Sequence, residues 1–196
     1  MADIKSAREI AMEKVAKLGD ATEEERLQWR YVPEGEKLAA KYLKSQSNIL
    51  PEINKYEGKA KTFVIEGIRD VLVKNIDLPR NETAKRSTKN AMDGLRLILQ
   101  DKVAVENAFS KIRRVMDHYQ GQGGQQKQQA YQELKQEFSL RVQQALKQQY
   151  GTASNMKIDV ERQPQFQEEW VKLQAHLDSQ YLKLLNEYKQ ELRKLS

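Results

Sequence analysis

Apolar residues recur every three or four positions along most of the chain, which is the spacing of an amphipathic helix. The pattern predicts a short helix over residues 3–18, which ends at Gly19. Thr22 and Glu25 have the spacing of a capping box and predict the start of a second helix. The N-terminal part of the chain is therefore expected to consist of short helices.

Pro33 is expected to end this second helix and to begin the next one, because a residue before proline avoids helical angles. Residues 1–48 are thus predicted to form an arm that packs on the rest of the protein. Aromatic residues near Pro33 indicate either a binding surface or the contact by which the arm docks. We favour docking, because an exposed aromatic cluster promotes unwanted association. These residues are Trp29, Tyr31 and Tyr42.

The helical period continues over residues 53–76. Gly58 and Gly67 weaken this predicted helix, but a glycine also allows a neighbouring helix to approach closely. Pro79 is expected to end the segment, and Asn81 is expected to cap the helix that follows.

Residues 81–119 carry the strongest pattern in the chain, a heptad-like apolar seam within one predicted long helix. Lys102 interrupts the seam and is expected either to reach solvent or to pair with an acidic residue of a facing helix. Further stripes follow over residues 131–145 and 164–195, the last of which begins at Pro164. The side chains expected to contact a partner are Leu95, Ile98, Val105, Phe109, Ile112, Met116, Trp170, Leu177 and Leu184.

The glycine- and glutamine-rich stretch QGQGGQQKQQ, residues 120–129, separates two of these stripes. Its irregular part covers only residues 120–124, so we predict the turn of a helical hairpin there. The glutamines that follow are expected to be helical and to form a polar face that lies partly buried against another helix. Residues 152–164 are irregular, and within them Met156, Ile158 and Val160 alternate with polar residues, as in a short strand. Because no partner strand is visible, we interpret the segment as an extended loop packed on the helices.

Together these patterns predict an all-α protein. Residues 49–196 are expected to form an elongated antiparallel bundle or hairpin with coiled-coil-like seams, and the arm of short helices precedes it. The chain has only 9 glycines and 4 prolines, too few for a many-stranded fold. It has no cysteine, no signal peptide and no apolar run of membrane-spanning length, so we expect a cytoplasmic protein without a membrane span.

Catalytic motifs are absent from the sequence: there is no phosphate-binding loop, no dinucleotide fingerprint and no metalloprotease motif. Neither His118 nor His176 has a glutamate three residues before it, the spacing that di-metal helical bundles use. We interpret both histidines as surface or interface residues. No catalytic residue, metal, cofactor or small-molecule substrate is therefore predicted.

The net charge of +6 is mildly basic, and basic residues gather between positions 80 and 114. They suit either a solvated helix face or contacts with phosphates of a nucleic acid. We favour the solvated face, because no aromatic residues alternate with them and no DNA-binding motif is present. The candidate phosphate contacts are Arg80, Lys85, Arg86, Lys89, Arg113 and Arg114.

Three segments, IKSAREIAMEKVAKLG, YVPEGEKLAAKYL and KIDVERQPQFQEEWVKLQAHLDSQYLKLLNEYK, resemble a group of uncharacterised bacterial helical proteins. The resemblance covers most of the chain and implies a bacterial cytoplasmic protein, with no assigned activity to carry over. The helices are also similar in composition to peripheral-stalk subunits of rotary ATPases, although the globular α/β end of those subunits is not evident here.

We therefore expect a non-enzymatic helical interaction or scaffold protein, which acts through self-association or a helical partner. The alternative is a nucleic-acid-associated protein that binds phosphates through the basic face at residues 80–114.

Overall fold

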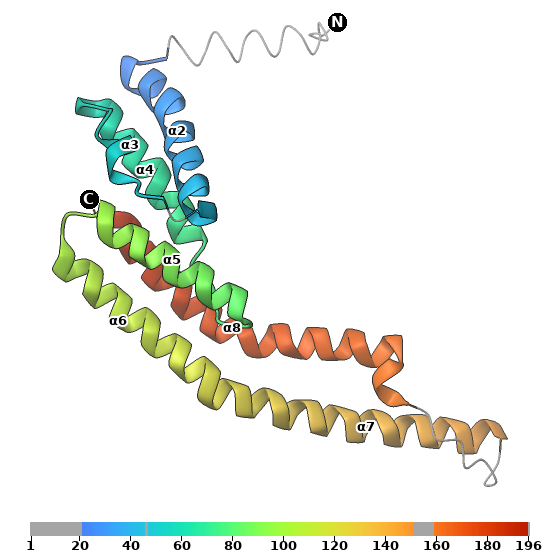
Figure 1. The fold of residues 1–196 in the computed structure, drawn as a ribbon. Helices are drawn as coiled ribbons and strands as arrows, with labels where there is room; N and C mark the ends of the chain where they lie inside the picture. Colours follow the sequence, from blue (N-terminus) through green and yellow to red (C-terminus); the bar gives the residue numbers. More distant parts are fainter. Residues whose placement is uncertain (1–20, 46, 151–158, 196) are drawn as a thin grey trace, which may run out of the picture. The chain divides into compact units, whose positions relative to one another are not determined.

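The computed structural model describes residues 21–45, 47–150 and 159–195 (Figure 1). These residues form helices and connecting loops without a strand, which confirms the all-α class. The helix expected at 3–18 and the first part of the expected extended loop lie outside the described residues. No described helix is both long and apolar enough to cross a membrane. The elements are α2 (Glu23–Ser45), α3 (Leu50–Ile53), α4 (Gly58–Lys74), α5 (Glu82–Ile98), α6 (Lys102–His118), η1 (Tyr119–Gly123), α7 (Gly124–Tyr150), η2 (Val160–Arg162) and α8 (Pro164–Lys194).

The contacts divide the chain into two compact units after Leu72, near the C-terminal end of α4. The first unit holds α2, α3 and most of α4, and the second unit holds all later elements. The boundary expected at residue 48 lies in the loop between α2 and α3.

Helix α2 runs without interruption through Pro33, so the prediction that Pro33 ends a short segment is wrong. The capping box is confirmed: the backbone N–H of Thr22 donates to Glu25 at 2.8 Å, and the N–H of Glu25 donates to the Thr22 hydroxyl at 3.2 Å. Proline has no backbone N–H, so α2 lacks one helical hydrogen bond at Pro33. The close packing of α2 on α4 around this position offsets that loss, because helix stability in proteins comes mainly from tertiary contacts.

The aromatic residues near Pro33 do not form a single docking contact. Tyr42 is buried, and Tyr31 meets Tyr56 edge-to-face with 5.8 Å between the ring centroids. Trp29, however, is 66% exposed, so the docking interpretation is wrong for this residue.

Gly35 and Gly67 allow the backbones of α2 and α4 to touch. A Cβ atom on Gly35 would lie 2.1 Å from the carbonyl oxygen of Val64, and one on Gly67 would lie 2.2 Å from the carbonyl oxygen of Val32. The Cα hydrogens take these directions instead and point at the carbonyl oxygens, a weak contact common between closely packed helices. The close approach expected at Gly67 is therefore confirmed.

The helix expected over residues 53–76 is interrupted, so its prediction as one helix is wrong. Helix α3 ends at Ile53, and α4 begins only at Gly58. Gly58 has a φ of 54°, a left-handed conformation that glycine adopts without steric cost. The glycine thus lies at the start of a helix rather than inside one.

The heptad-like seam belongs to two helices, so the prediction of one long helix over residues 81–119 is also wrong. Leu99 is extended, with a ψ of 140°, and Asp101 caps α6 by accepting a backbone N–H bond at 2.9 Å. Lys102 is exposed to solvent, as one of the two alternatives expected, and it pairs with no acidic residue of a facing helix among the described residues. Its ammonium donates to the carbonyl oxygens of Arg96 at 2.5 Å and Leu99 at 2.7 Å, which lie at the C-terminal end of α5 and lack helical partners.

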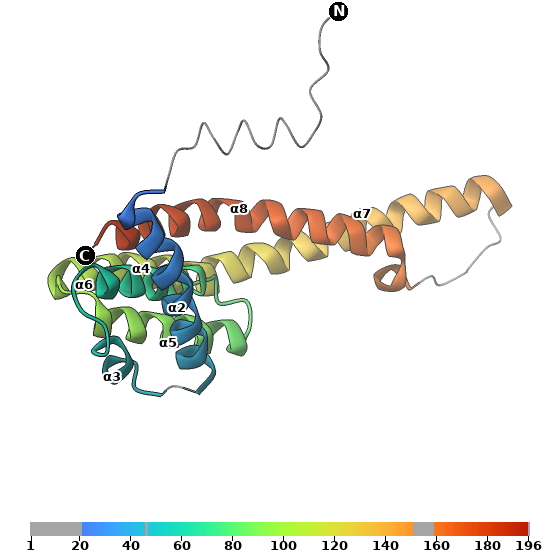
Figure 2. The ribbon, with the colours of Figure 1, turned by 90° about the horizontal axis from the view of Figure 1, so that it is seen from above.

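Helices α6 and α7 join through η1 into one continuous helical stretch, as Figures 1 and 2 show. The hairpin turn predicted at residues 120–124 is therefore wrong. Residues Tyr119 and Gly124 both have right-handed helical angles, and η1 is a single π-helical turn. A reversal needs backbone outside the helical region, whereas this stretch stays helical because Tyr119 and Gly123 are buried against α8.

Helix α8 runs beside both α6 and α7 in the second unit (Figure 2). Pro164 opens it as expected, and it extends to Lys194. The stripe expected on α7 is confirmed, because Leu134 and Phe138 are buried with Phe166 in one core cluster. The glutamines that follow the glycines are helical, as expected, but they are exposed rather than partly buried; they are Gln125, Gln126, Gln128 and Gln129.

Candidate binding site

The loop between α4 and α5 holds Arg80 in a fixed place. Thr88, buried on α5, accepts the Asp77 N–H at 3.0 Å and donates its hydroxyl to the Asp77 carbonyl at 3.1 Å. Asn81 caps α5, as expected, by accepting the Ala84 N–H at 2.8 Å. Arg80 thus lies between two anchored points of the chain.

The π-helical turn brings Tyr119 and Lys127 to the same face of the continuous helix. Eight residues of α-helix turn through about 800°, which would leave these side chains about 80° apart. A π turn absorbs one extra residue, so eight residues act as seven and the difference falls to about 20°. The Lys127 ammonium accordingly lies over the Tyr119 ring, 4.2 Å from its centroid.

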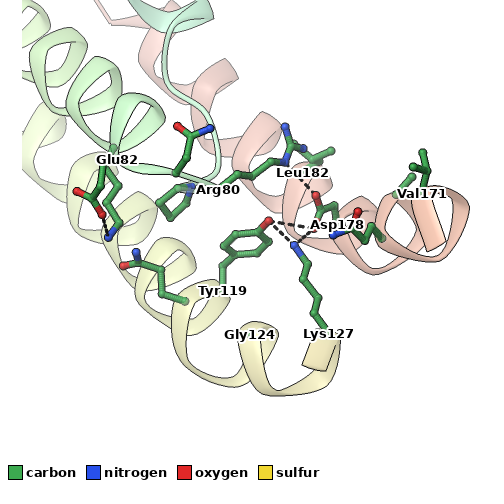
Figure 3. A pocket seen from close by; sticks show the side chains of 14 residues that line it. Arg80, Glu82, Tyr119, Gly124, Lys127, Val171, Asp178 and Leu182 are labelled. Carbon is green, nitrogen blue, oxygen red and sulfur yellow. Dashed lines mark hydrogen bonds and ion pairs between the residues drawn. The ribbon is translucent and has the colours of Figure 1, made fainter. Parts of the chain in front are cut away.

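These two side chains and Arg80 converge on Asp178 of α8 (Figure 3). Asp178 is only 6% exposed, and its carboxylate lies 2.6 Å from the Lys127 ammonium and 3.0 Å from Nε of Arg80. The Tyr119 hydroxyl donates to it at 3.1 Å and accepts from Lys127 at 2.5 Å. The four side chains form a cluster that ties the α5 loop, the π turn, α7 and α8 together.

The charges in this cluster stabilise one another. Burial by itself would raise the pKa of the Asp178 carboxyl, but bonds from Lys127 and Arg80 outweigh burial and lower that pKa. Burial would likewise lower the pKa of Lys127, but the bonds to Asp178 and Tyr119 raise it. The pKa of Arg80 is also raised, since its bond to Asp178 and the nearby Asp77 outweigh burial. The cluster holds two cations and one carboxylate, and Asp77, which lies 3.6 Å from Arg80, supplies a second carboxylate beside it.

The cluster forms the floor of an open cleft of about 720 Å³, which we call the Asp178 cleft. Figure 3 shows Arg80, Tyr119 and Lys127 reaching it from three directions. Its walls mix polar and apolar side chains. The remaining lining residues are Pro79, Asn81, Glu82, Lys85, Gln120, Gly124, Val171, Gln174, Ala175 and Leu182.

A second hollow of about 340 Å³ lies between α5 and α6, and we call it the α5–α6 groove. Its apolar side chains are Pro79, Met92 and Met116. Its charged side chains are mostly basic. They are Lys85, Lys89, Arg96 and Arg113, against Asp93 and Asp117.

The structure separates the six basic residues that were candidates for phosphate contacts. Lys89 and Arg113 line the α5–α6 groove, Arg80 lies in the Asp178 cleft, and Lys85 lines both hollows. Because two helices replace the expected single one, the six do not form one row along one helix. The other two are Arg86, exposed on α5, and Arg114, exposed on α6.

The predicted interaction seam lies mostly inside the second unit. Five of its residues are less than 10% exposed: Leu95, Ile98, Val105, Phe109 and Ile112. Met116, Trp170 and Leu177 are half-buried, and only Leu184, at 43%, is largely exposed. Contact with another chain through this seam would require the second unit to unpack.

Both histidines are exposed, and Nδ1 of His118 lies 3.0 Å from the Tyr181 hydroxyl. Within the described residues, no three His, Asp or Glu side chains are grouped closely enough to hold a metal ion.

Tyr119, Lys127 and Asp178 belong to no sequence motif, and none of them was among the predicted site residues. One signal was available: Lys127 is the only residue charged at neutral pH between Asp117 and Glu133.

The fold and the cleft define an all-helical protein with a positively charged hollow beside a long continuous helix. The chain belongs to DUF6657, a family of unknown function, whose model matches residues 50–194, about three quarters of its length. No curated protein and no solved structure matches the chain. The expected resemblance to an uncharacterised helical family is thus confirmed, and the matched residues include the whole Asp178 cleft and α5–α6 groove.

Proposed function

We propose that this chain is a non-enzymatic interaction protein that binds an acidic segment of a partner protein in the α5–α6 groove. One observation carries the proposal: an apolar floor and a predominantly basic lining occur together in one hollow. Methionines suit such a site, because their flexible side chains adapt to different apolar groups. A helical segment with one apolar anchor and flanking acidic residues complements this arrangement.

The charges around the groove favour an acidic partner. Arg96 and Arg113 already share Glu106, at 2.6 and 3.0 Å. Lys89, by contrast, makes no ion pair with any described residue, and it is exposed on α5. A carboxylate of the partner segment would therefore meet Lys89 without displacing an existing pair.

The groove is less suited to a nucleic acid. No aromatic residue lines it, so it lacks a surface on which bases stack. Asp93 and Asp117 also lie among its cations, where they would repel a phosphate backbone. We therefore favour an acidic peptide as the ligand of the groove, and binding of a nucleic acid is the alternative.

Fluorescence anisotropy with helical peptides tests the proposal. Three peptides share a central leucine anchor and differ in flanking residues, which are acidic, neutral or basic. The full chain should bind the acidic peptide most tightly, and Lys89→Glu should weaken that binding about three- to tenfold at low salt. The matched control is Lys183→Glu, at an exposed position of α8, which should leave the affinity unchanged.

Two results would count against the proposal. Equal binding of the acidic and basic peptides would remove the role of charge, and binding of none of them would remove the groove as a peptide site. Salt-dependent binding of a duplex oligonucleotide that Lys89→Glu abolishes would favour the nucleic-acid function instead.

A further inference from the structure

We propose that the Asp178 cleft is a binding site for a small molecule that carries an oxyanion, a phosphate or carboxylate group, held by Arg80 and Lys127. This site adjoins the α5–α6 groove, and Pro79, Lys85 and Gln120 line both hollows. Arg80 and Lys127 line only the cleft.

Both cations keep hydrogen-bond donors that the protein does not use. An ammonium group has three N–H donors, and Lys127 directs two of them at Asp178 and Tyr119. Nε of Arg80 bonds Asp178, and its Nη1 lies 3.6 Å from Asp77. Nη2 of Arg80 has no partner among the described residues. The remaining donors are available to a ligand in the cleft that both side chains line.

Asp178 holds the remaining donors of Lys127 and Arg80 in fixed positions and leaves them available to a ligand. Its carboxylate fixes the position of the Lys127 ammonium and the Arg80 guanidinium, so a ligand need not order two long side chains on binding. Three cations line the cleft against two carboxylates, which favours an anionic ligand. The partial burial of the floor strengthens that attraction relative to open solvent.

The size and walls of the cleft suit an organic anion larger than the oxyanion alone. Its volume of about 720 Å³ lies within the range of roughly 300–1,000 Å³ that is usual for small-molecule sites. Val171, Leu182 and Pro79 provide apolar contact for the body of the ligand. Asn81, Gln120 and Gln174 add uncharged hydrogen-bonding groups.

The π turn provides separate support for a binding role. Isolated π turns within helices occur frequently at functional sites, since they cost hydrogen-bond geometry that packing alone seldom requires. Here the turn supplies Tyr119 and Gln120 to the cleft and sets the register that brings Lys127 into it.

The test uses isothermal titration calorimetry of the full chain with inorganic phosphate, pyrophosphate and citrate, at constant ionic strength set with chloride. At least one of these probes should bind saturably, and the preferred probe distinguishes a phosphate from a carboxylate ligand. Arg80→Gln should weaken binding roughly tenfold or more, because charged hydrogen bonds are lost. The matched control, Lys89→Gln in the α5–α6 groove, should leave binding unchanged.

Asp178→Asn separates a binding site from a purely structural ion pair. In a binding site this variant binds the same probe more weakly, because Arg80 and Lys127 lose the carboxylate that orders them. Diffuse charge attraction would instead strengthen, because one negative charge is removed. The proposal is overturned if none of the three probes binds saturably to the wild-type chain. It is also overturned if Arg80→Gln and Lys89→Gln weaken binding equally, since that result indicates diffuse charge attraction. Should Asp178→Asn not fold, Arg80→Gln decides alone, because the Arg80 side chain is 45% exposed.

Discussion

Tyr119 and Lys127 share one face of the long helix of the second unit only because a π turn lies between them. The glycine-containing π turn therefore shifts the register of the helix between Tyr119 and Lys127 and does not act as a hinge. Deletion of Gly121 should convert the π turn into regular α-helix. The side chains of α6 and α7 should then keep their present directions around the helix axis. We expect the free energy of unfolding to stay within about 1 kcal/mol of wild type, as measured by urea denaturation.

A deletion elsewhere in the same helix provides the control. Removal of Gln136, which is exposed on α7, should rotate all later residues by about 100° and take Phe138 out of the core that it shares with Phe166. A loss of about 3 kcal/mol or more is expected, as for truncation of a buried aromatic side chain. Equal losses for the two deletions would show that the π turn has no register role.

The sequence predicted the helical class and most apolar stripes, because the apolar residues recur with the helical period of 3.6 residues. It also predicted Asn81 and the Thr22–Glu25 capping box, since these are local hydrogen bonds. The errors concern helix continuity. Pro33 and the glycines after Tyr119 are helix breakers by propensity, yet both stay helical where neighbouring helices pack on them.

The candidate sites were harder to predict from the sequence, for a physical reason. The Asp178 cleft joins residues almost 100 positions apart, and Arg80 reaches Asp178 only through the packing of α5 and α8 around the π turn. Lys85, Lys89 and Arg113 were recognised as basic, but their meeting in one groove depends on the break at Leu99, which the continuous apolar seam concealed.

Asp178→Asn should change how stability depends on pH. The pKa of Asp178 is lowered in the folded state, so its stabilising effect is complete above the ordinary carboxyl pKa and is lost as the pH falls through the folded-state value. The difference in unfolding free energy between wild type and Asp178→Asn should therefore be largest near pH 7 and shrink below about pH 4. Urea denaturation at a series of pH values measures it, and a difference independent of pH would contradict the ion-pair account.

Lys102→Met distinguishes two roles for the lysine in the apolar seam. If Lys102 merely interrupted the seam, methionine would stabilise the protein by adding apolar contact. Since its ammonium instead bonds the carbonyls of Arg96 and Leu99, we expect a loss of about 1 kcal/mol. Thermal denaturation should show a lower melting temperature, whereas Lys147→Met on exposed α7 should show little change. A higher melting temperature for Lys102→Met would contradict the capping role.

Gly35→Ala and Gly67→Ala should each destabilise the first unit, although alanine is the better helix former by about 1 kcal/mol. The added methyl groups would lie 2.1 and 2.2 Å from carbonyl oxygens of the opposing backbone, which no side-chain rotation relieves. Helices α2 and α4 must therefore move apart, and we expect a net loss of about 1–3 kcal/mol. Amide hydrogen exchange measures this loss locally, as faster exchange in α2 and α4 with little change in α6 and α8. Gly121→Ala is the matched control, since nothing lies within 4 Å of a Cβ there, and it should not speed exchange in either unit. Unchanged exchange in Gly35→Ala would show that the two helices do not pack through these glycines.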